Sequence, residues 1–259
     1  MSKLKLIMVA ILFAGVLTIF FPAPVQAMHI SEGILPLEWA VAWYVIAFPF
    51  VYIGIRQISS RTKSDKRLLP LMALMGAVAF LISCFPIPVP IAGTCSHPCG
   101  TPLAAILVGG PFISSVLGAI ALLLQALFLA HGGISSWGAN ILSMAVAGSF
   151  VGFGVFILLK KLNVSIFVAG FAAGLLGDWA TYVVTAFQLA LALHGDGSLW
   201  GMWGANIVAF MPAQLPLGIL EGIFTGGVVT FVAQRRPQIL AYLMPGVPAP
   251  LMKTGGETG

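Results

Sequence analysis

The sequence predicts an all-α, polytopic membrane protein with seven transmembrane segments, one of them short, after a cleaved signal peptide. The chain of 259 residues is 59% hydrophobic and only 7% charged, whereas about 25% of a soluble domain is charged. Its mean hydropathy is +1.06. Apolar stretches recur along the chain, and their length is close to the roughly 20 residues that a membrane-spanning helix needs. Basic residues gather between alternate stretches. A bilayer must therefore be the main solvent of this surface.

Residues 1–27 have the pattern of a signal peptide. Lys3 and Lys5 form a basic start, an apolar stretch runs to Phe21, and Val25-Gln26-Ala27 has the small-x-small pattern of a cleavage site. Cleavage after Ala27 would make Met28 the mature N-terminus. An uncleaved signal-anchor helix is the alternative.

The rest of the chain divides into apolar segments and short polar connections. We expect helices at about 37–56, 69–88, 111–130, 137–160, 165–190 and 205–232. A shorter segment at about 101–109 ends at Gly109-Gly110-Pro111. It can lie at membrane depth only where protein or water surrounds it. The expected domains are a transmembrane, metal-binding domain at 28–236 and a short, disordered cytoplasmic tail at 237–259.

The distribution of basic residues predicts the topology. The ten Lys and Arg residues of the mature chain are Arg56, Arg61, Lys63, Lys66, Arg67, Lys160, Lys161, Arg235, Arg236 and Lys253. With seven segments and an outside N-terminus, all of them face the cytoplasm, as the positive-inside rule requires. We therefore expect a multi-pass inner-membrane protein with its C-terminus in the cytoplasm. The net charge of +5 marks a membrane face and not a nucleic-acid site.

The predicted mature terminus carries the first candidate metal ligands. The α-amine of Met28, the backbone nitrogen of His29 and the His29 imidazole can close adjacent chelate rings that lie nearly in one plane. Planar nitrogen ligation suits Ni(II), Cu(II) and, by extension, low-spin Co(II), whereas zinc prefers a tetrahedron. His97, in a loop on the same predicted outer face, is the best candidate for a fourth nitrogen.

Five motifs follow one another over nearly all of the mature chain. They are Met-His-Ile-Ser-Glu-Gly at 28–33, Cys-Ser-His-Pro-Cys-Gly-Thr at 95–101, Leu-Leu-Gln-Ala-Leu-Phe-Leu-Ala-His-Gly-Gly at 123–133, Gly-Asp-Trp-Ala-Thr-Tyr-Val-Val-Thr-Ala at 177–186 and Gln-Leu-Pro-Leu-Gly-Ile-Leu-Glu-Gly at 214–222. In this order they resemble the CbiM/NikM family. Members of this family are the substrate-binding membrane components of energy-coupling-factor (ECF) transporters for cobalt and nickel. One departure from the family pattern is Cys99, where the family more often has threonine.

The resemblance implies an ECF S-component-like fold whose N-terminal segment dips into the protein. It implies that Met28, His29 and His97 hold the transported Co(II) or Ni(II), with no prosthetic group. It further implies a small membrane partner, a transmembrane coupling subunit and ATPase subunits. The chain itself has no Gly-x-x-x-x-Gly-Lys-Ser/Thr loop for a nucleotide. It is therefore expected to be a non-catalytic transporter subunit, serving cobalamin biosynthesis when the cargo is cobalt.

Other polar residues are expected to support the site. Glu32, with Ser31, should hydrogen-bond within the N-terminal segment and could orient an imidazole N–H; Ser96 adjoins His97. His131 and His194 could support or capture the metal, but both precede glycine at outer helix ends, which favours helix capping over a metal role. Asp178 and Glu221 lie within apolar helices, where we expect hydrogen bonds to neighbouring helices around the N-terminal segment.

The cysteines and the overall function leave alternatives open. Cys84 should be a packed side chain, and Cys95 and Cys99 could form a disulfide in an oxidising compartment. A nickel importer of the same family is the main alternative to a cobalt importer. An intramembrane metalloenzyme would need a His-Glu-x-x-His pair, but no two histidines lie within five residues. A scaffold with incidental histidines is the third reading.

Overall fold

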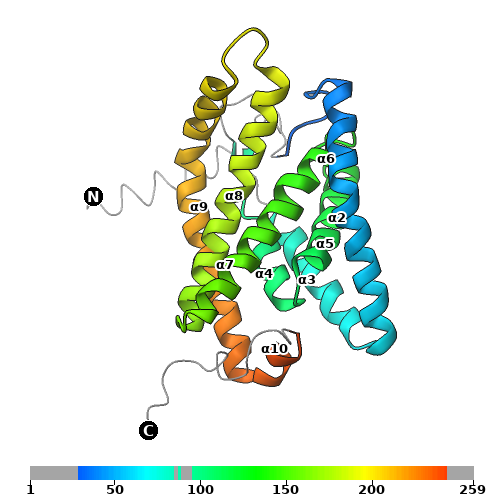
Figure 1. Cartoon of the computed structure of the whole chain (residues 1–259), viewed down its shortest axis with the longest axis vertical. Helices are drawn as coiled ribbons and strands as arrows, with labels where there is room; N and C mark the ends of the chain where they lie inside the picture. The colour runs from blue at the N-terminus through cyan, green and yellow to red at the C-terminus, as the bar shows by residue number, and fades with distance from the viewer. Residues whose placement is uncertain (1–28, 85–86, 89–94, 244–259) are drawn as a thin grey trace, which may run out of the picture.

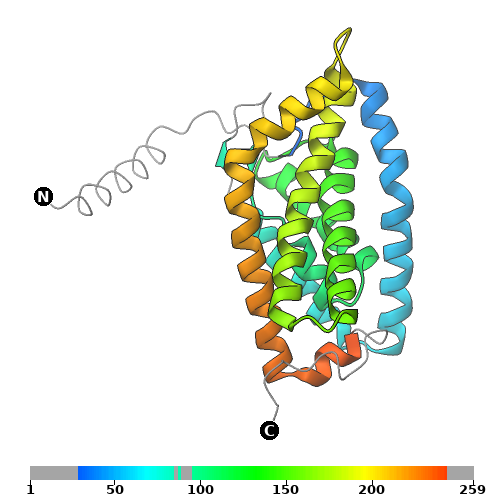
Figure 2. The same cartoon turned by 60° about the vertical axis from the view of Figure 1, so that its left-hand side comes forward.

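The computed structural model describes residues 29–84, 87–88 and 95–243. The predicted signal peptide, Met28 and residues 244–259 lie outside the described residues. Long helices run between the two ends of one bundle (Figures 1 and 2). The helices are α2 (Leu37–Ser64), α3 (Leu68–Ile82), α4 (Thr101–Leu107), α5 (Pro111–Phe128), α6 (Trp137–Asn140), the π-helix η1 (Ile141–Gly148), α7 (Ser149–Lys161), α8 (Ile166–Leu193), α9 (Leu199–Arg235) and α10 (Pro237–Leu243). Two short strands, β1 (Ile87–Pro88) and β2 (Cys95–Ser96), pair antiparallel.

Five helices of the described chain are long and apolar enough to cross a membrane, with α6, η1 and α7 counted as one. The prediction of a helical, multi-pass membrane protein is therefore confirmed. Three boundaries differ clearly from expectation. α2 continues eight residues beyond the predicted end at 56 and finishes at Ser64. α3 ends at Ile82, and the Ser83 hydroxyl after it donates to the Ala79 carbonyl of the last turn at 2.7 Å. α9 begins at Leu199, where the Ser198 hydroxyl accepts a hydrogen bond from the Gly201 N–H.

The described basic clusters share one end of the bundle, here called the basic end. α2, α7 and α9 all finish there, at the bottom of Figures 1 and 2. Arg61 on α2 donates hydrogen bonds to the carbonyl oxygens of Val108 (2.8 Å) and Gly109 (3.3 Å), just after α4. A cation suits the carbonyl end of a helix, so Arg61 fixes the end of α4 at the basic end.

The short helix α4 lies inside the bundle, and all seven of its residues are buried. Its N-cap, Gly100, has φ +68°, and a Cβ there would lie 3.0 Å from the Ala79 backbone. The Thr101 hydroxyl donates to the Met144 carbonyl in η1 at 2.8 Å. The prediction of a short segment surrounded by protein is thus confirmed in place and length.

Glycines allow α8 and α9 to pack closely, as small residues do between membrane helices. A Cβ at Gly218 would lie 2.3 Å from Nε1 of Trp179, and a Cβ at Gly226 would lie 2.7 Å from the Phe167 carbonyl oxygen. Side chains larger than hydrogen would force the two helices apart. This contact fixes the face of α9 that meets the polar residues of α8.

The first part of the C-terminal tail is helical, so the expectation of a disordered tail is wrong for residues 237–243. Leu240 and Leu243 of α10 are buried in the same apolar core as α3, α4 and α9. The Tyr242 hydroxyl donates to Asp65 Oδ2 at 3.1 Å. Burial of two leucines accounts for the ordering, at roughly 1.5–3 kcal/mol for each.

Candidate metal centre

The N-terminal segment enters the bundle at the end opposite the basic end. The Ile30 N–H donates to Asn140 Oδ1 at 2.9 Å, and Asn140 Nδ2 donates to the Ile30 carbonyl at 3.2 Å. The Ser136 hydroxyl donates to the same carbonyl. Ile30 itself is fully buried. One asparagine side chain therefore satisfies both backbone groups of Ile30, as a neighbouring strand would.

The Gly132-Gly133 pair lets the N-terminal segment lie directly against the α5–α6 connection. A Cβ at Gly133 would lie 2.6 Å from Glu32 Cα, and Gly132 has φ +84° with its Cβ position 3.1 Å from His29 Cβ. No side chain fits between these backbones. The glycines bring His29 to the end of α5.

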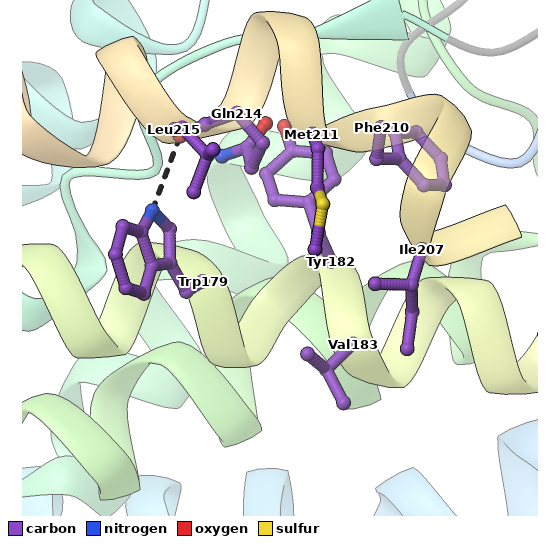
Figure 3. A pocket seen from close by; sticks show the side chains of 8 residues that line it. All are labelled: Trp179, Tyr182, Val183, Ile207, Phe210, Met211, Gln214 and Leu215. Carbon is purple, nitrogen blue, oxygen red and sulfur yellow. Dashed lines mark hydrogen bonds between the residues drawn. The ribbon is translucent and has the colours of Figure 1, made fainter. Parts of the chain in front are cut away.

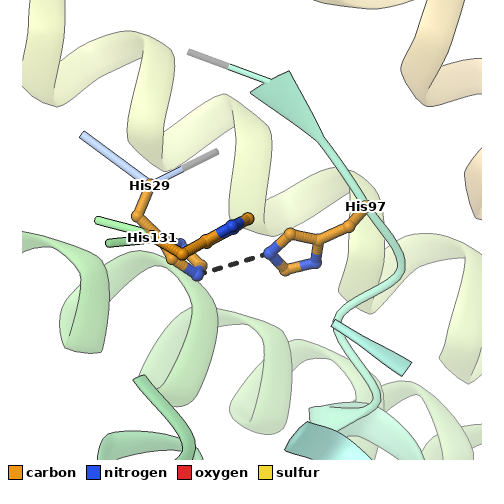
Figure 4. A group of neighbouring side chains, drawn as sticks. All are labelled: His29, His97 and His131. Carbon is orange, nitrogen blue, oxygen red and sulfur yellow. Dashed lines mark hydrogen bonds between the residues drawn. The ribbon is translucent and has the colours of Figure 1, made fainter. Parts of the chain in front are cut away.

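Three buried histidines meet beneath this segment, and we call them the histidine cluster: His29, His97 and His131 (Figure 4). One ligand atom from each lies within 4.8 Å of the others. The ring centroids of His29 are 4.9 Å from His97 and 5.2 Å from His131. His97 Nε2 lies 3.3 Å from His29 Nε2.

A chain of hydrogen bonds fixes which nitrogen of His29 carries the proton. The Ser83 hydroxyl donates to the Ala79 carbonyl at 2.7 Å, so its oxygen accepts from Gln125 Nε2 at 2.6 Å. Gln125 Oε1 then faces His29 Nε2 at 3.0 Å. Since an amide oxygen only accepts, His29 Nε2 carries the proton. Its Nδ1 is left with a free lone pair.

The loop of His97 is held from α8 and by its own backbone. The Tyr182 hydroxyl accepts from the His97 N–H at 3.0 Å and donates to the His97 carbonyl at 3.1 Å. His97 Nδ1 donates to the Pro98 carbonyl at 2.7 Å, because a carbonyl only accepts. The free lone pair of His97 is therefore on Nε2, which points at His29 (Figure 4).

Burial keeps the histidine cluster neutral. Burial lowers the pKa of His29 to about 3, with a further contribution from nearby His131. Burial likewise lowers the pKa of His131 to about 4 and that of His97 well below its usual value. A metal binds the neutral imidazole. At neutral pH these rings are ready to bind a cation without first losing a proton.

A separate cavity of about 190 Å³ lies between α8 and α9 (Figure 3). Its walls are apolar or aromatic apart from the Tyr182 hydroxyl and the amide of Gln214. It has no group of convergent nitrogen or carboxylate ligands. The histidine cluster is therefore the better candidate for a site that binds a cation.

Comparison with known proteins identifies the family. Residues 29–239 match the CbiM family, described as "Cobalt uptake substrate-specific transmembrane region". The chain belongs to the CbiM family. It is 53% identical over 218 residues to the cobalt transport protein CbiM of Geobacter sulfurreducens, covering 84% of this chain and 63% of that protein. The chain thus spans less than two thirds of that relative.

Other matches agree with this membership. The cobalt transport protein CbiM of Sorangium cellulosum is 50% identical over 213 residues, which cover 82% of this chain and 94% of that protein. A crystal structure described as a transition metal transporter matches with a TM-score of 0.73 at 30% identity, covering 83% of this chain and 98% of that chain. A truncated form matches with a TM-score of 0.72, 30% identity and coverages of 80% and 99%.

The structure of this CbiM-family chain brings His29 and His97 together, while Met28 lies outside the described residues. The interpretation of His131 as a helix cap is wrong for its ring. The ring joins the histidine cluster, and its buried Nε2 has no hydrogen-bond partner among the described residues. His194 does act as expected, since its Nδ1 donates to the Ala190 carbonyl at 3.0 Å.

Glu32 does not orient an imidazole. It is exposed, and both of its carboxylate oxygens accept from the Ser135 N–H at 3.2 and 3.1 Å. Hydrogen bonding from Ser135 lowers the pKa of Glu32. Gln125, which the sequence reasoning did not consider for this role, orients His29 instead. Its position six residues before His131 in one motif was the available signal.

Asp178 and Glu221 are buried, as expected of intramembrane carboxylates, but they support the His97 loop and not the N-terminal segment. Glu221 accepts from the N–H groups of Cys99 (2.6 Å) and Gly100 (2.8 Å), and Asp178 accepts from Gln214. Ser96 is buried, with no partner for its hydroxyl in the described part of the chain. Cys84 and Cys99 are free thiols, and the side chain of Cys95 lies outside the described residues.

Proposed function

We propose that this chain is the substrate-capture membrane subunit of an ECF (ABC-type) cobalt importer. It binds Co(II) at the outer face and delivers it inward for cobalamin biosynthesis. The observation that carries the proposal is the buried, neutral histidine cluster beneath the N-terminal segment. The family match and the names of the relatives favour cobalt as the cargo over nickel.

The proposed ligands are the amine of Met28, the backbone nitrogen and Nδ1 of His29, and Nε2 of His97. Two hydrogen bonds support this assignment. Gln125 occupies His29 Nε2 and leaves Nδ1 free for the chelate ring, and the Pro98 carbonyl occupies His97 Nδ1 and leaves Nε2 free. A planar set of four nitrogens suits Co(II) in a low-spin state and suits zinc poorly, because zinc prefers a tetrahedron.

His131 supplies the alternative ligand set. A tetrahedral ion held by the three imidazoles would make His131 a ligand, and its unpartnered Nε2 favours some role beside the metal. In the planar site, His131 would lie next to the two ligand histidines without binding the metal. X-ray absorption separates the two geometries, because they differ in coordination shape and in the number of imidazoles.

The proposed topology has seven membrane segments, including α3 and the half-length α4, in the inner membrane. The signal peptide is removed, the mature N-terminus is outside, and the basic end faces the cytoplasm. Movement of the metal inward requires energy that this chain does not supply. ATPase subunits, a transmembrane coupling subunit and a small membrane partner complete the proposed importer.

The test is the metal content of the mature protein purified from cells supplied with cobalt and nickel. The wild type should hold at least one nitrogen-ligated cobalt per chain, and His29→Ala should lose this nitrogen-ligated cobalt. His194→Ala is the matched control, because that ring only caps α8, and it should keep its cobalt. Full occupancy in His29→Ala would refute the proposed site. If N-terminal sequencing found that the chain begins at Met1, Met28 would have no free α-amine, and the proposed amine ligand would be refuted.

A further inference from the structure

A second group of potential metal ligands lies next to the histidine cluster, formed by Cys99, Asp178 and Glu221. Their ligand atoms lie within 4.8 Å of one another, and all three residues are buried. Asp178 precedes Tyr182 by one helical turn, about 6 Å along α8. Because α8 begins at the basic end, this group lies on the basic-end side of the histidine cluster. We call it the inner cluster.

The contacts within the inner cluster converge on one point. Cys99 Sγ lies 3.4 Å from Asp178 Oδ1 and 3.5 Å from the Thr181 hydroxyl. Glu221 reaches the same loop from α9 through the N–H groups of Cys99 and Gly100. Each carboxylate oxygen has a second lone pair, so these bonds leave Glu221 able to bind a cation.

A fourth polar side chain, Gln214, contacts the inner cluster. The Gln214 amide nitrogen donates to Asp178 Oδ2. The oxygen of the same amide has no hydrogen-bond partner among the described residues, although Gln214 is only 4% exposed. A buried amide oxygen without a partner costs about 1–3 kcal/mol. A cation bound beside Asp178 would satisfy it.

The charge balance of the inner cluster also favours a cation. No Lys or Arg side chain contributes to the surroundings of either carboxyl group among the described residues. Two carboxylates away from water are costly unless a positive charge or a proton compensates them. A divalent cation would neutralise both. The mixture of sulfur and oxygen ligands suits a transition metal better than Mg²⁺ or Ca²⁺.

We propose that Cys99, Asp178 and Glu221, with the amide oxygen of Gln214, form an inner site that receives the transported divalent metal from the histidine cluster. This inference rests on the proposed function. His97 and Cys99 are separated only by Pro98, so a small movement of one loop exchanges an imidazole for a thiolate. The thiol gives its proton to solvent when it binds the metal. Beyond the site, the buried helix α4 closes the path to the basic end.

The test is a Co(II) titration of the full mature protein in detergent micelles. A reductant that is not itself a thiol and does not bind metal keeps the cysteines reduced. Optical absorption and X-ray absorption follow each equivalent. The wild type should bind two equivalents, the first with nitrogen ligands only. The second should bring thiolate-to-cobalt charge transfer and sulfur scattering. Cys99→Ser should keep the first equivalent, lose the sulfur signature and weaken the second at least about tenfold.

Control variants make the result decisive. Cys84→Ser removes the other described free thiol and should retain both equivalents and the sulfur signature. Asp178→Asn should weaken the second equivalent, with Asp196→Asn as an exposed acidic control. If Asp178→Asn does not fold, Cys99→Ser still decides, because its first equivalent reports that the protein is folded.

Failure of the inner site and failure of the proposed function give different results. A wild type that binds one nitrogen-ligated equivalent, lost in His29→Ala, would overturn the inner site and leave the proposed function intact. Loss of the first equivalent in His29→Ala with retention of the sulfur-ligated one would support both. Retention of both equivalents in His29→Ala would refute the proposed histidine site and, with it, the transfer of metal from the histidine cluster to the inner cluster.

Discussion

Replacing Gln125 with methionine tests whether the hydrogen-bond chain from Ala79 orients His29 for metal binding. Methionine has a similar length but cannot accept the His29 Nε2–H bond. In the metal-free protein, His29 can still donate to His97 Nε2, 3.3 Å away, or move its proton to Nδ1. When a metal occupies His29 Nδ1 and His97 Nε2, the proton can neither move to Nδ1 nor be donated to His97. The substitution therefore penalises the metal-bound form selectively.

The magnitude follows from the buried N–H left without an acceptor. Gln125 Oε1 lies 3.0 Å from His29 Nε2 in a fully buried site, and an unsatisfied buried donor costs about 1–3 kcal/mol. The affinity for Co(II) should therefore fall about 5- to 150-fold. Loss of an outer partner of a metal-bound histidine typically has an effect of this size, about 10- to 100-fold.

The assay is equilibrium dialysis of the purified mature protein against Co(II). Gln188→Met is the matched control, because Gln188 is also buried and its amide donates to the Ala139 carbonyl at 3.0 Å, away from the histidines. The control should bind cobalt like the wild type. An affinity of Gln125→Met within about twofold of the control would refute the orienting role.

Three further predictions follow from the same contacts. Asn140→Ala removes both side-chain hydrogen bonds to the Ile30 backbone, which are worth about 1 kcal/mol each. Equilibrium dialysis should therefore find the affinity for Co(II) lowered at least about tenfold. Unchanged binding would contradict the role of Asn140 in anchoring the N-terminal segment. Burial lowers the pKa values of the histidine cluster below 6.5, so the unfolded chain binds more protons in acid. The free energy of unfolding is therefore unaffected by these histidines above pH 6.5 and falls below that pH by about 1.4 kcal/mol per pH unit for each histidine. Thermal melts of the metal-free protein at about pH 7 and 5 check this prediction. Equal melting temperatures would contradict it. Gly218→Ala puts a Cβ 2.3 Å from Trp179 Nε1 and should lower the free energy of unfolding by about 1–3 kcal/mol. Gly227→Ala meets open space and should raise it by up to about 1 kcal/mol. A higher melting temperature for Gly218→Ala than for Gly227→Ala would refute the close packing of α8 and α9.

The helices were predictable because hydrophobic length and charge placement are local features of a membrane chain. The short segment before Pro111 could be recognised from the position of Lys160 and Lys161, and α4 lies there. The tail helix α10 could not, because its order depends on a groove formed by helices far away in the sequence. The π-helix η1 also depends on tertiary contacts, since Thr101 and Ser115 bond its Met144 and Ala145 carbonyls.

The site was predictable where a motif has its own chemistry and not where the role depends on packing. His29 and His97 were found because one follows a cleavage pattern and the other lies in a His-Pro loop. Gln125 was missed, and His131 was considered for a supporting role but assigned mainly to helix capping, because only the close approach at Gly132 brings the end of α5 against His29.

The π-helix η1 lies within the membrane span formed by α6, η1 and α7. Its wider turns change the direction in which side chains before it point relative to side chains after it. On one side, Asn140 faces the Ile30 backbone; on the other, the Ser149 hydroxyl donates to Ser114 at 2.9 Å. A π-helix carries more residues per turn than an α-helix, so shifting the surplus residue along the span would turn one half by about 100° while the other stays in place. Asn140 would then turn away from Ile30. Such a local rewinding of one helix would release the Ile30 backbone from Asn140 without requiring a change in the other helices.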